Sequence, residues 1–134
     1  MNLPLPSGST DADYAHAFEV VVEPVVRQFA PQAILVSAGE DIHHDDPLGS
    51  MLVTDAGFAD MALRCVRLAR EFSEGRLAFV LEGGYDRDGT ARAVEAILRA
   101  VADETAPAIA AKGTERAAAA VARARETQAT YWDL

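Results

Sequence analysis

The sequence predicts an α/β protein built on parallel strands. Helical and strand-like segments follow one another in the order helix, strand, helix, strand, helix, which is the pattern of a parallel sheet with right-handed crossovers. Both strand candidates are short apolar runs bounded by turn residues. Parallel sheets are normally larger and covered on both faces, and two strands alone leave long unpaired edges. We therefore expect the chain to be part of a larger domain.

The first helix is expected to begin near Thr10 or Asp11, which are good N-cap residues, and to end at Pro31. Its apolar residues recur at steps of three and four, as one buried helix face requires. They are Tyr14, Phe18, Val21, Val22, Val25 and Phe29. Pro24 lies inside this pattern, so we expect it to kink the helix or split it.

Two buried strands, over residues 33–37 and 77–81, are expected to enclose the second helix. That helix is expected to be capped by Thr54 or Asp55 and closed by Gly75. Its apolar stripe consists of Phe58, Met61, Cys65, Leu68 and Phe72. The regular spacing of these residues indicates core packing, which makes the single cysteine an inert buried thiol.

The third helix is expected over residues 88–102. Its inward-facing residues are expected to be Val94, Ile97, Leu98 and Val101. Beyond it the chain is rich in alanine and only weakly amphipathic, with a further helix over residues 117–127. We therefore divide the chain into an α/β part, residues 1–102, and an Ala-rich helical tail, residues 103–134.

Composition narrows the classes of partner and compartment. The chain of 134 residues has 12 Lys and Arg against 21 Asp and Glu, for a net charge of −9, which argues against nucleic acid or an anionic membrane as partner. One cysteine excludes a disulfide framework. The amino terminus lacks the basic and apolar segments of a signal peptide, and no apolar run is long enough for a bilayer. We expect a cytoplasmic location.

Polar residues gather in the two loops that follow the strands. The first loop carries Asp41, His43, His44, Asp45 and Asp46, and the second carries Glu82, Gly83, Gly84 and Tyr85. Loops at the carboxyl ends of neighbouring parallel strands are where such sheets bind ligands. Asp and His are ligands of Zn²⁺, and a tyrosine on a Gly-Gly turn can point into a cleft. Spacing alone leaves two interpretations open, a solvated turn and a metal-binding loop made of Asp41, His43, His44 and Asp45.

Both loops also carry recognisable motifs. They are Val36-Ser37-Ala38-Gly39 with Asp41, His43 and Asp46-Pro47-Leu48-Gly49, followed by Leu81-Glu82-Gly83-Gly84-Tyr85. These motifs closely resemble the histone deacetylase and acetylpolyamine amidohydrolase superfamily, and the opening residues 2–8 are similar to the family segment before the first strand. The resemblance covers roughly residues 2–102. It implies the C-terminal part of an arginase/deacetylase-like domain, so that residues 1–102 form a partial deacetylase-like unit.

The resemblance implies a role for each matching residue. Asp41 corresponds to a carboxylate that ligates the catalytic zinc. Tyr85 corresponds to the hydroxyl that hydrogen-bonds the substrate carbonyl and then the oxyanion, and Gly83 and Gly84 form the turn that presents it. In such enzymes zinc polarises the amide carbonyl and a water molecule that attacks it. A donor aimed at the oxyanion is typically worth ~3 kcal/mol of barrier, so we expect Tyr85 to be essential.

The chain also departs from the family pattern. Glu40 stands where relatives often have an apolar residue, and its charge would alter the local field or require a partner. The family's other zinc ligands, in an Asp-X-His motif, and its catalytic histidine pair lie upstream of the region covered here. His43 and His44 imitate these motifs in the wrong loop and are assigned neither role. A catalytic zinc normally has three protein ligands, and the resemblance gives this chain one.

These observations lead to two expectations. The first is a C-terminal fragment of a zinc-dependent deacetylase for acetyl-lysine or acetylpolyamine-type substrates, inactive alone; whether the chain itself is an enzyme stays open. The alternative is a non-catalytic module that pairs with another chain through its unpaired strand edge. In either case the expected partner is a second copy or the missing N-terminal half.

Overall fold

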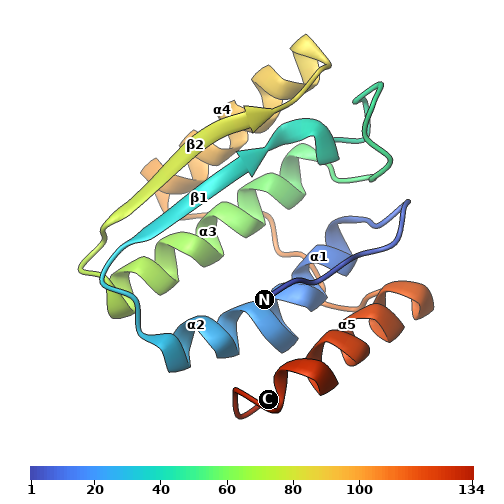
Figure 1. The fold of residues 1–134 in the computed structure, drawn as a ribbon. Helices are drawn as coiled ribbons and strands as arrows, with labels where there is room; N and C mark the ends of the chain where they lie inside the picture. Colours follow the sequence, from blue (N-terminus) through green and yellow to red (C-terminus); the bar gives the residue numbers. More distant parts are fainter.

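The computed structural model describes all residues from 1 to 134 and has an α/β architecture (Figure 1). The elements are α1 (Asp11–Ala17), a π-helical turn (Phe18–Val22), α2 (Glu23–Phe29), β1 (Ile34–Gly39), a 3₁₀ turn (Glu40–Ile42), α3 (Asp55–Phe72), β2 (Leu77–Gly83), α4 (Arg87–Asp103) and α5 (Glu115–Gln128). The predicted alternation and the helical tail are confirmed. No helix combines the length and apolar composition that a bilayer span needs.

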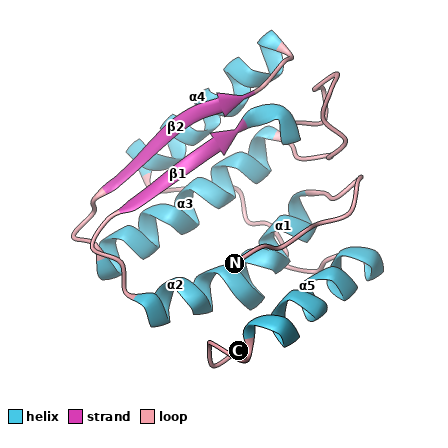
Figure 2. Cartoon of the chain, in the orientation of Figure 1, coloured by secondary structure: helices cyan, strands magenta, loops and turns pink.

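Strands β1 and β2 pair in parallel, in a register that sets Ile34 opposite Leu77. A shift in the register after Ala38 sets Gly39 opposite Gly83, where both strands end. Helices α3 and α4 lie on one side of this sheet, and its other side is bare (Figure 2). The expectation of buried strands is therefore wrong for one face: the side chains of Leu35 and Val80 are 78% and 54% exposed.

The first helix passes through Pro24 without leaving helical backbone. Its α1 part ends in a π-helical turn at Phe18–Val22, and Pro24 occupies the first turn of α2. Proline has no N–H to donate to the carbonyl four residues earlier, and a π turn changes the hydrogen-bond register just before it. The predicted disturbance at Pro24 thus takes the form of an altered helical turn, and α2 ends at Ala30 in the left-handed conformation (φ 49°).

The main core forms where α3 crosses α4. Its buried residues are Val53, Phe58, Ala59, Ala62, Ala93, Ile97 and Ala100. Alanines on both helices bring the two backbones close together, so that α4 turns its small residues inward. The expectation that Leu98 faces the core is wrong, because it is 62% exposed. Val101, 38% exposed, borders the core and faces a hollow that Val66, Leu77 and Phe79 also line.

Helix α5 packs against the first helix (Figure 1). Val121 is buried with Ala17 and Val21, and Trp132 meets the ring of Phe29 edge-on at 6.5 Å between centroids. The tail is thus attached by its own small core. Its treatment as a unit separate from residues 1–102 stays a prediction.

Candidate active site

Asp41 lies at the end of β1, in a 3₁₀ turn that places its carboxylate between two glycines. A Cβ atom on Gly39 would lie 2.8 Å from the carboxylate oxygen Oδ1, and one on Gly83 would lie 2.7 Å from the same atom. Because a side chain at either position would fill this space, the two glycines form a cradle for the carboxylate. The structure therefore brings the first predicted site residue against the second loop.

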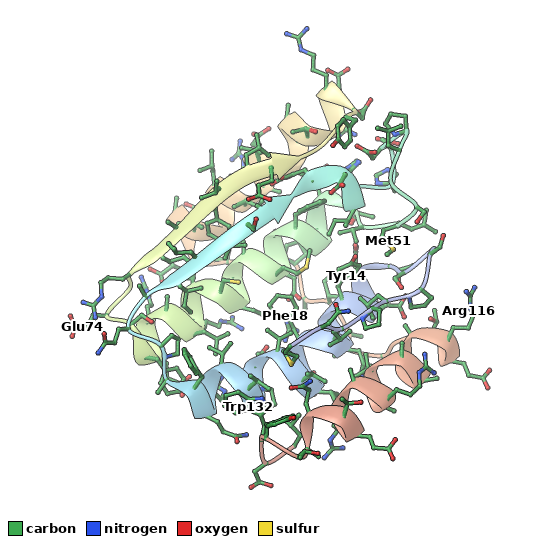
Figure 3. All side chains as sticks on the ribbon, in the orientation of Figure 1. Tyr14, Phe18, Met51, Glu74, Arg116 and Trp132 are labelled. Carbon is green, nitrogen blue, oxygen red and sulfur yellow. The ribbon has the colours of Figure 1, made fainter.

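Tyr14 of α1 lies within the electrostatic reach of Asp41. Burial, and then the charge of Asp41, raise the pKa of Tyr14 to about 12. Tyr14 and Met51, both labelled in Figure 3, pack against the main core. The sequence placed Tyr14 on an apolar helix face and gave no sign of this neighbour, because the approach of α1 to the loop after β1 is a tertiary contact.

Tyr85 follows β2 on the predicted Gly-Gly turn. Gly84 has φ of 120°, a conformation that side chains other than glycine rarely adopt, and a Cβ there would also collide with Thr90. The side chain of Tyr85 is 61% exposed. The turn thus presents the phenol to the outside of the chain at the same end of the sheet as Asp41.

Asp46 connects the two loops. Its Oδ1 accepts the backbone N–H groups of Leu48 (2.9 Å) and Gly49 (2.7 Å) in its own loop. Its Oδ2 accepts those of Tyr85 (2.7 Å) and Asp86 (3.3 Å) in the second loop. Burial by itself raises the pKa of Asp46. The four hydrogen bonds together lower it by more than burial raises it, so the pKa of Asp46 lies below its ordinary value.

His43 and His44 are held by hydrogen bonds inside their loop. His43 is 1% exposed; its Nε2 lies 3.0 Å from Asp55, and its Nδ1 accepts the N–H of Asp45 at 3.1 Å. His44 directs Nδ1 to the carbonyl of Val53 at 3.2 Å. Both nitrogens of His43 are thus engaged, which leaves it no lone pair for a metal in this arrangement.

The histidines and Asp45 form the chain's one cluster of three potential metal ligands, whose ligand atoms lie within 4.8 Å of one another. Asp41 is not part of that cluster. Asp45 also pairs with Arg92 at 2.5 Å. The structure therefore does not assemble the four-residue metal loop that spacing alone left open.

Glu40 is buried directly beside Asp41, with 2% of its side chain exposed. Burial raises the pKa of Glu40, a backbone hydrogen bond lowers it, and the charge of Asp41 raises it again, for a net increase. Its Oε2 has no hydrogen-bond partner in the chain. Of the two expectations for Glu40, an altered local field or a partner, the chain supplies no partner for this oxygen.

The cradle of Asp41 fits the role of one carboxylate ligand of zinc. The carboxylate of Asp41 packs against Gly39 and Gly83, where the absence of side chains leaves room for it. A catalytic zinc takes three protein ligands, and no second and third His, Cys, Asp or Glu join Asp41 in a cluster. Asp41 is therefore the one expected ligand that this chain offers, and it stands outside the chain's only cluster of potential ligands.

Comparisons with known proteins show the family of the chain. The family model described as "Histone deacetylase domain" matches residues 1–101. The "Probable deacetylase" of Archaeoglobus fulgidus is 45% identical over 89 residues, which are 66% of this chain and 25% of that protein. "Histone deacetylase 14, chloroplastic" of Arabidopsis thaliana is 41% identical over 104 residues, which are 78% of this chain and 25% of that protein. The chain thus spans about a quarter of these relatives.

Solved structures show the same fold. The crystal structure of the "HDA15 HD domain" matches with a TM-score of 0.88 and 28% identity, over 99% of this chain and 35% of that one. The "histone deacetylase Clr3" matches with a TM-score of 0.89 and 28% identity, over 98% of this chain and 22% of that one. By its sequence, its fold and the arrangement of its two loops, the chain belongs to the histone deacetylase domain family.

Proposed function

We propose that this chain forms the C-terminal part of the catalytic domain of a zinc-dependent deacetylase. The substrates of such a domain would be acetyl amides of the acetyl-lysine or acetylpolyamine type. The observation that carries the proposal is the contact of the Asp41 carboxylate with Gly83, because it joins the expected metal ligand to the loop of Tyr85. The family's deacetylases support the reaction class.

Each residue has one role in this proposal. Asp41 holds one coordination position of the zinc ion, which when bound polarises the amide carbonyl and a water molecule. Tyr85 donates its hydroxyl proton in a hydrogen bond to the carbonyl oxygen and to the oxyanion that replaces it. Gly83 and Gly84 bring these two groups to the same end of the sheet.

The isolated chain is proposed to be inactive. It offers Asp41 as its single zinc ligand of the family type, whereas three are needed. We propose that the remaining ligands and the general base come from the rest of the domain, on the same polypeptide or on a partner. The purified chain should therefore release no acetate from acetyl-lysine peptides or acetylpolyamines when zinc is supplied. Hydrolysis that a chelator abolishes would contradict this.

A chimaera tests the activity itself. In the Arabidopsis relative, the 104 matching residues are replaced by those of this chain, and acetate release is measured with zinc present. Tyr85→Phe should lower kcat about 100-fold, because it removes one oxyanion donor. Asp41→Asn should abolish both activity and stoichiometric zinc binding.

Asp45→Asn is the matched control for the chimaera. Asp45 lies in the same loop as Asp41 but outside the proposed site, so this variant should keep the parent activity. An active chimaera that tolerates Asp41→Asn would overturn the proposal.

A specific observation favours a second function, that of a non-catalytic module which pairs with another chain. The bare face of the sheet exposes Leu35 and Val80, and exposed apolar faces with open strand edges invite association. Size-exclusion chromatography distinguishes the two functions when it is combined with the chimaera. A stable homo-oligomer together with an inactive chimaera would favour the module.

We also propose a class of partner and a location for the protein. The net charge of −9 favours partners other than nucleic acid or an anionic membrane. We propose a cytoplasmic location, where Cys65 stays a reduced thiol. Burial, and then the charge of Glu23, raise the pKa of Cys65 to about 11, which keeps the thiol protonated and unreactive.

A further inference from the structure

We propose that Asp46 is a positioning residue for Tyr85. The inference rests on the proposed function, in which the phenol of Tyr85 meets the substrate. It assigns to a carboxylate outside the metal site the task of fixing the backbone from which that phenol extends.

Asp46 acts as a clamp, by which we mean the two hydrogen bonds that its carboxylate accepts from the backbone at Tyr85 and Asp86. The N–H groups of Tyr85 and Asp86, which Oδ2 of Asp46 accepts, lie on either side of the Cα atom of Tyr85. When both peptide groups are held, the backbone angles of Tyr85 are held too, and these angles set the direction of its Cα–Cβ bond. Successive N–H groups that converge on one anion form a concave binding arrangement. Here the anion is a side chain of the same protein.

The side chain of Tyr85 has little else to hold it. It is 61% exposed, so packing restrains it weakly. The preceding Gly84 is the most permissive residue the backbone can have. Asp86 adds stiffness on the other side, because its own side chain accepts the N–H of Gly89 at 2.5 Å and caps α4. Asp46 thus joins a loose turn to a rigid helix start.

Asp46 also ties this turn to Asp41. Its Oδ1 accepts the N–H of Gly49, and Gly49 packs so closely on the Asp41 carbonyl oxygen that a Cβ there would collide with it. One buried carboxylate, 8% exposed, therefore holds the backbone of the proposed metal ligand and that of the proposed oxyanion donor. Hydrogen bonds of N–H groups to a carboxylate are among the stronger ones in proteins.

Two variants separate the clamp from the fold. Asp46→Asn retains one acceptor oxygen, and its NH₂ group cannot accept the N–H groups that Oδ2 accepts. Asp46→Ser can still accept the N–H groups of its own loop but is too short to span to Tyr85. Neither variant should disturb α3, whose core lies elsewhere.

Amide hydrogen exchange on the purified chain tests the clamp without any activity. In both variants the amides of Tyr85 and Asp86 should exchange at least about 10-fold faster, the loss expected when a hydrogen bond of this kind is removed. The α3 amides of Leu63 and Val66 should keep their protection, and Asp45→Asn should change none of these amides. Unchanged exchange at Tyr85, or equal acceleration throughout α3, would overturn the proposal even if the chimaera had no activity.

A double-mutant cycle in the chimaera tests the link to catalysis. Asp46→Asn should lower kcat about 10-fold with KM nearly unchanged, because a donor that is present but poorly positioned loses part of the roughly 100- to 1000-fold that one such donor is worth. On the Tyr85→Phe background the same substitution should have little further effect, since the group it positions is gone. An equal loss on both backgrounds would show a general structural role and refute the proposal.

Discussion

At the scale of single residues, two glycines beside Asp41 should respond differently to an added methyl group. In Gly83→Ala the new Cβ would meet the carboxylate of Asp41, the free end of a side chain that can rotate away. In Gly49→Ala it would meet the backbone carbonyl of Asp41, which cannot. We expect Gly49→Ala to lower the free energy of unfolding of the chain by about 3 kcal/mol and Gly83→Ala by less than ~1 kcal/mol.

Gly83→Ala should affect the activity of the chimaera much more than it affects the stability of the chain. Because Gly83→Ala displaces the proposed metal ligand, it should remove activity from the chimaera while the chain keeps its stability. Urea unfolding of the chain and acetate release by the chimaera measure the two effects. Equal stability of the two alanine variants would contradict the close approach of Gly49 to Asp41.

The residues that the sequence could and could not identify differ in the kind of contact they make. Asp41, Gly83, Gly84 and Tyr85 stand in motifs, and the structure brings their two loops together as the parallel order required. Their roles at the site stay predictions. Asp46 also stands in a motif, but the sequence assigns it no role, because two of the N–H groups it accepts come from residues about 40 positions away and leave no trace in its own neighbourhood.

At the scale of elements, Asp13 attaches the C-terminal helix to the first one. Its carboxylate accepts the N–H and hydroxyl of Thr10, which caps α1, and the N–H of Thr114, which precedes α5. Burial by itself raises the pKa of Asp13. These hydrogen bonds together lower it by more, so the pKa of Asp13 lies below its ordinary value of 3.8. A lowered folded pKa means that the stabilisation is complete above the unfolded pKa and is lost as the pH falls through the folded one.

The pH dependence of Asp13→Asn follows from this sign. At neutral pH the variant should have a free energy of unfolding lower by about 1–2 kcal/mol, the usual value of such a cap. Below about pH 4 the difference from the parent chain should shrink, because the parent carboxyl becomes protonated too. Urea titrations from pH 7 to pH 3 measure it, with the exposed Asp103→Asn as control. A difference that is constant with pH would show that the charge of Asp13 contributes nothing.

The elements themselves were largely predictable. Local signals were enough for the strands and helix starts, such as the capping position of Thr54 before α3. The facing of α4 was predictable only in part, because Ile97 is buried as expected while the close packing of alanines between α3 and α4 leaves Leu98 outside the core. Pro24 marked the disturbed turn of the first helix, but only the structure shows a π turn there.

At the scale of the whole molecule, the bare face of the sheet shows what the rest of the domain has to cover. Leu35 and Val80 stand on that face, one on each strand. In the isolated chain they meet water, so replacing both by lysine should change the free energy of unfolding by less than about 0.5 kcal/mol. The same double variant should also suppress any association of the chain, because lysine on an exposed sheet opposes pairing.

In the chimaera the same two lysines should have the opposite effect. If the rest of the domain packs on this face, both ammonium groups become buried without partners, at a cost of several kcal/mol. The chimaera should then fail to fold or lose activity. The control is Ala122→Lys, at an exposed position of α5, which should leave the isolated chain unchanged. Thermal unfolding and sedimentation of both proteins provide the measurement. An active chimaera that carries both lysines would contradict this expectation. It would mean that the rest of the domain does not cover this face, which would then be open to a separate partner.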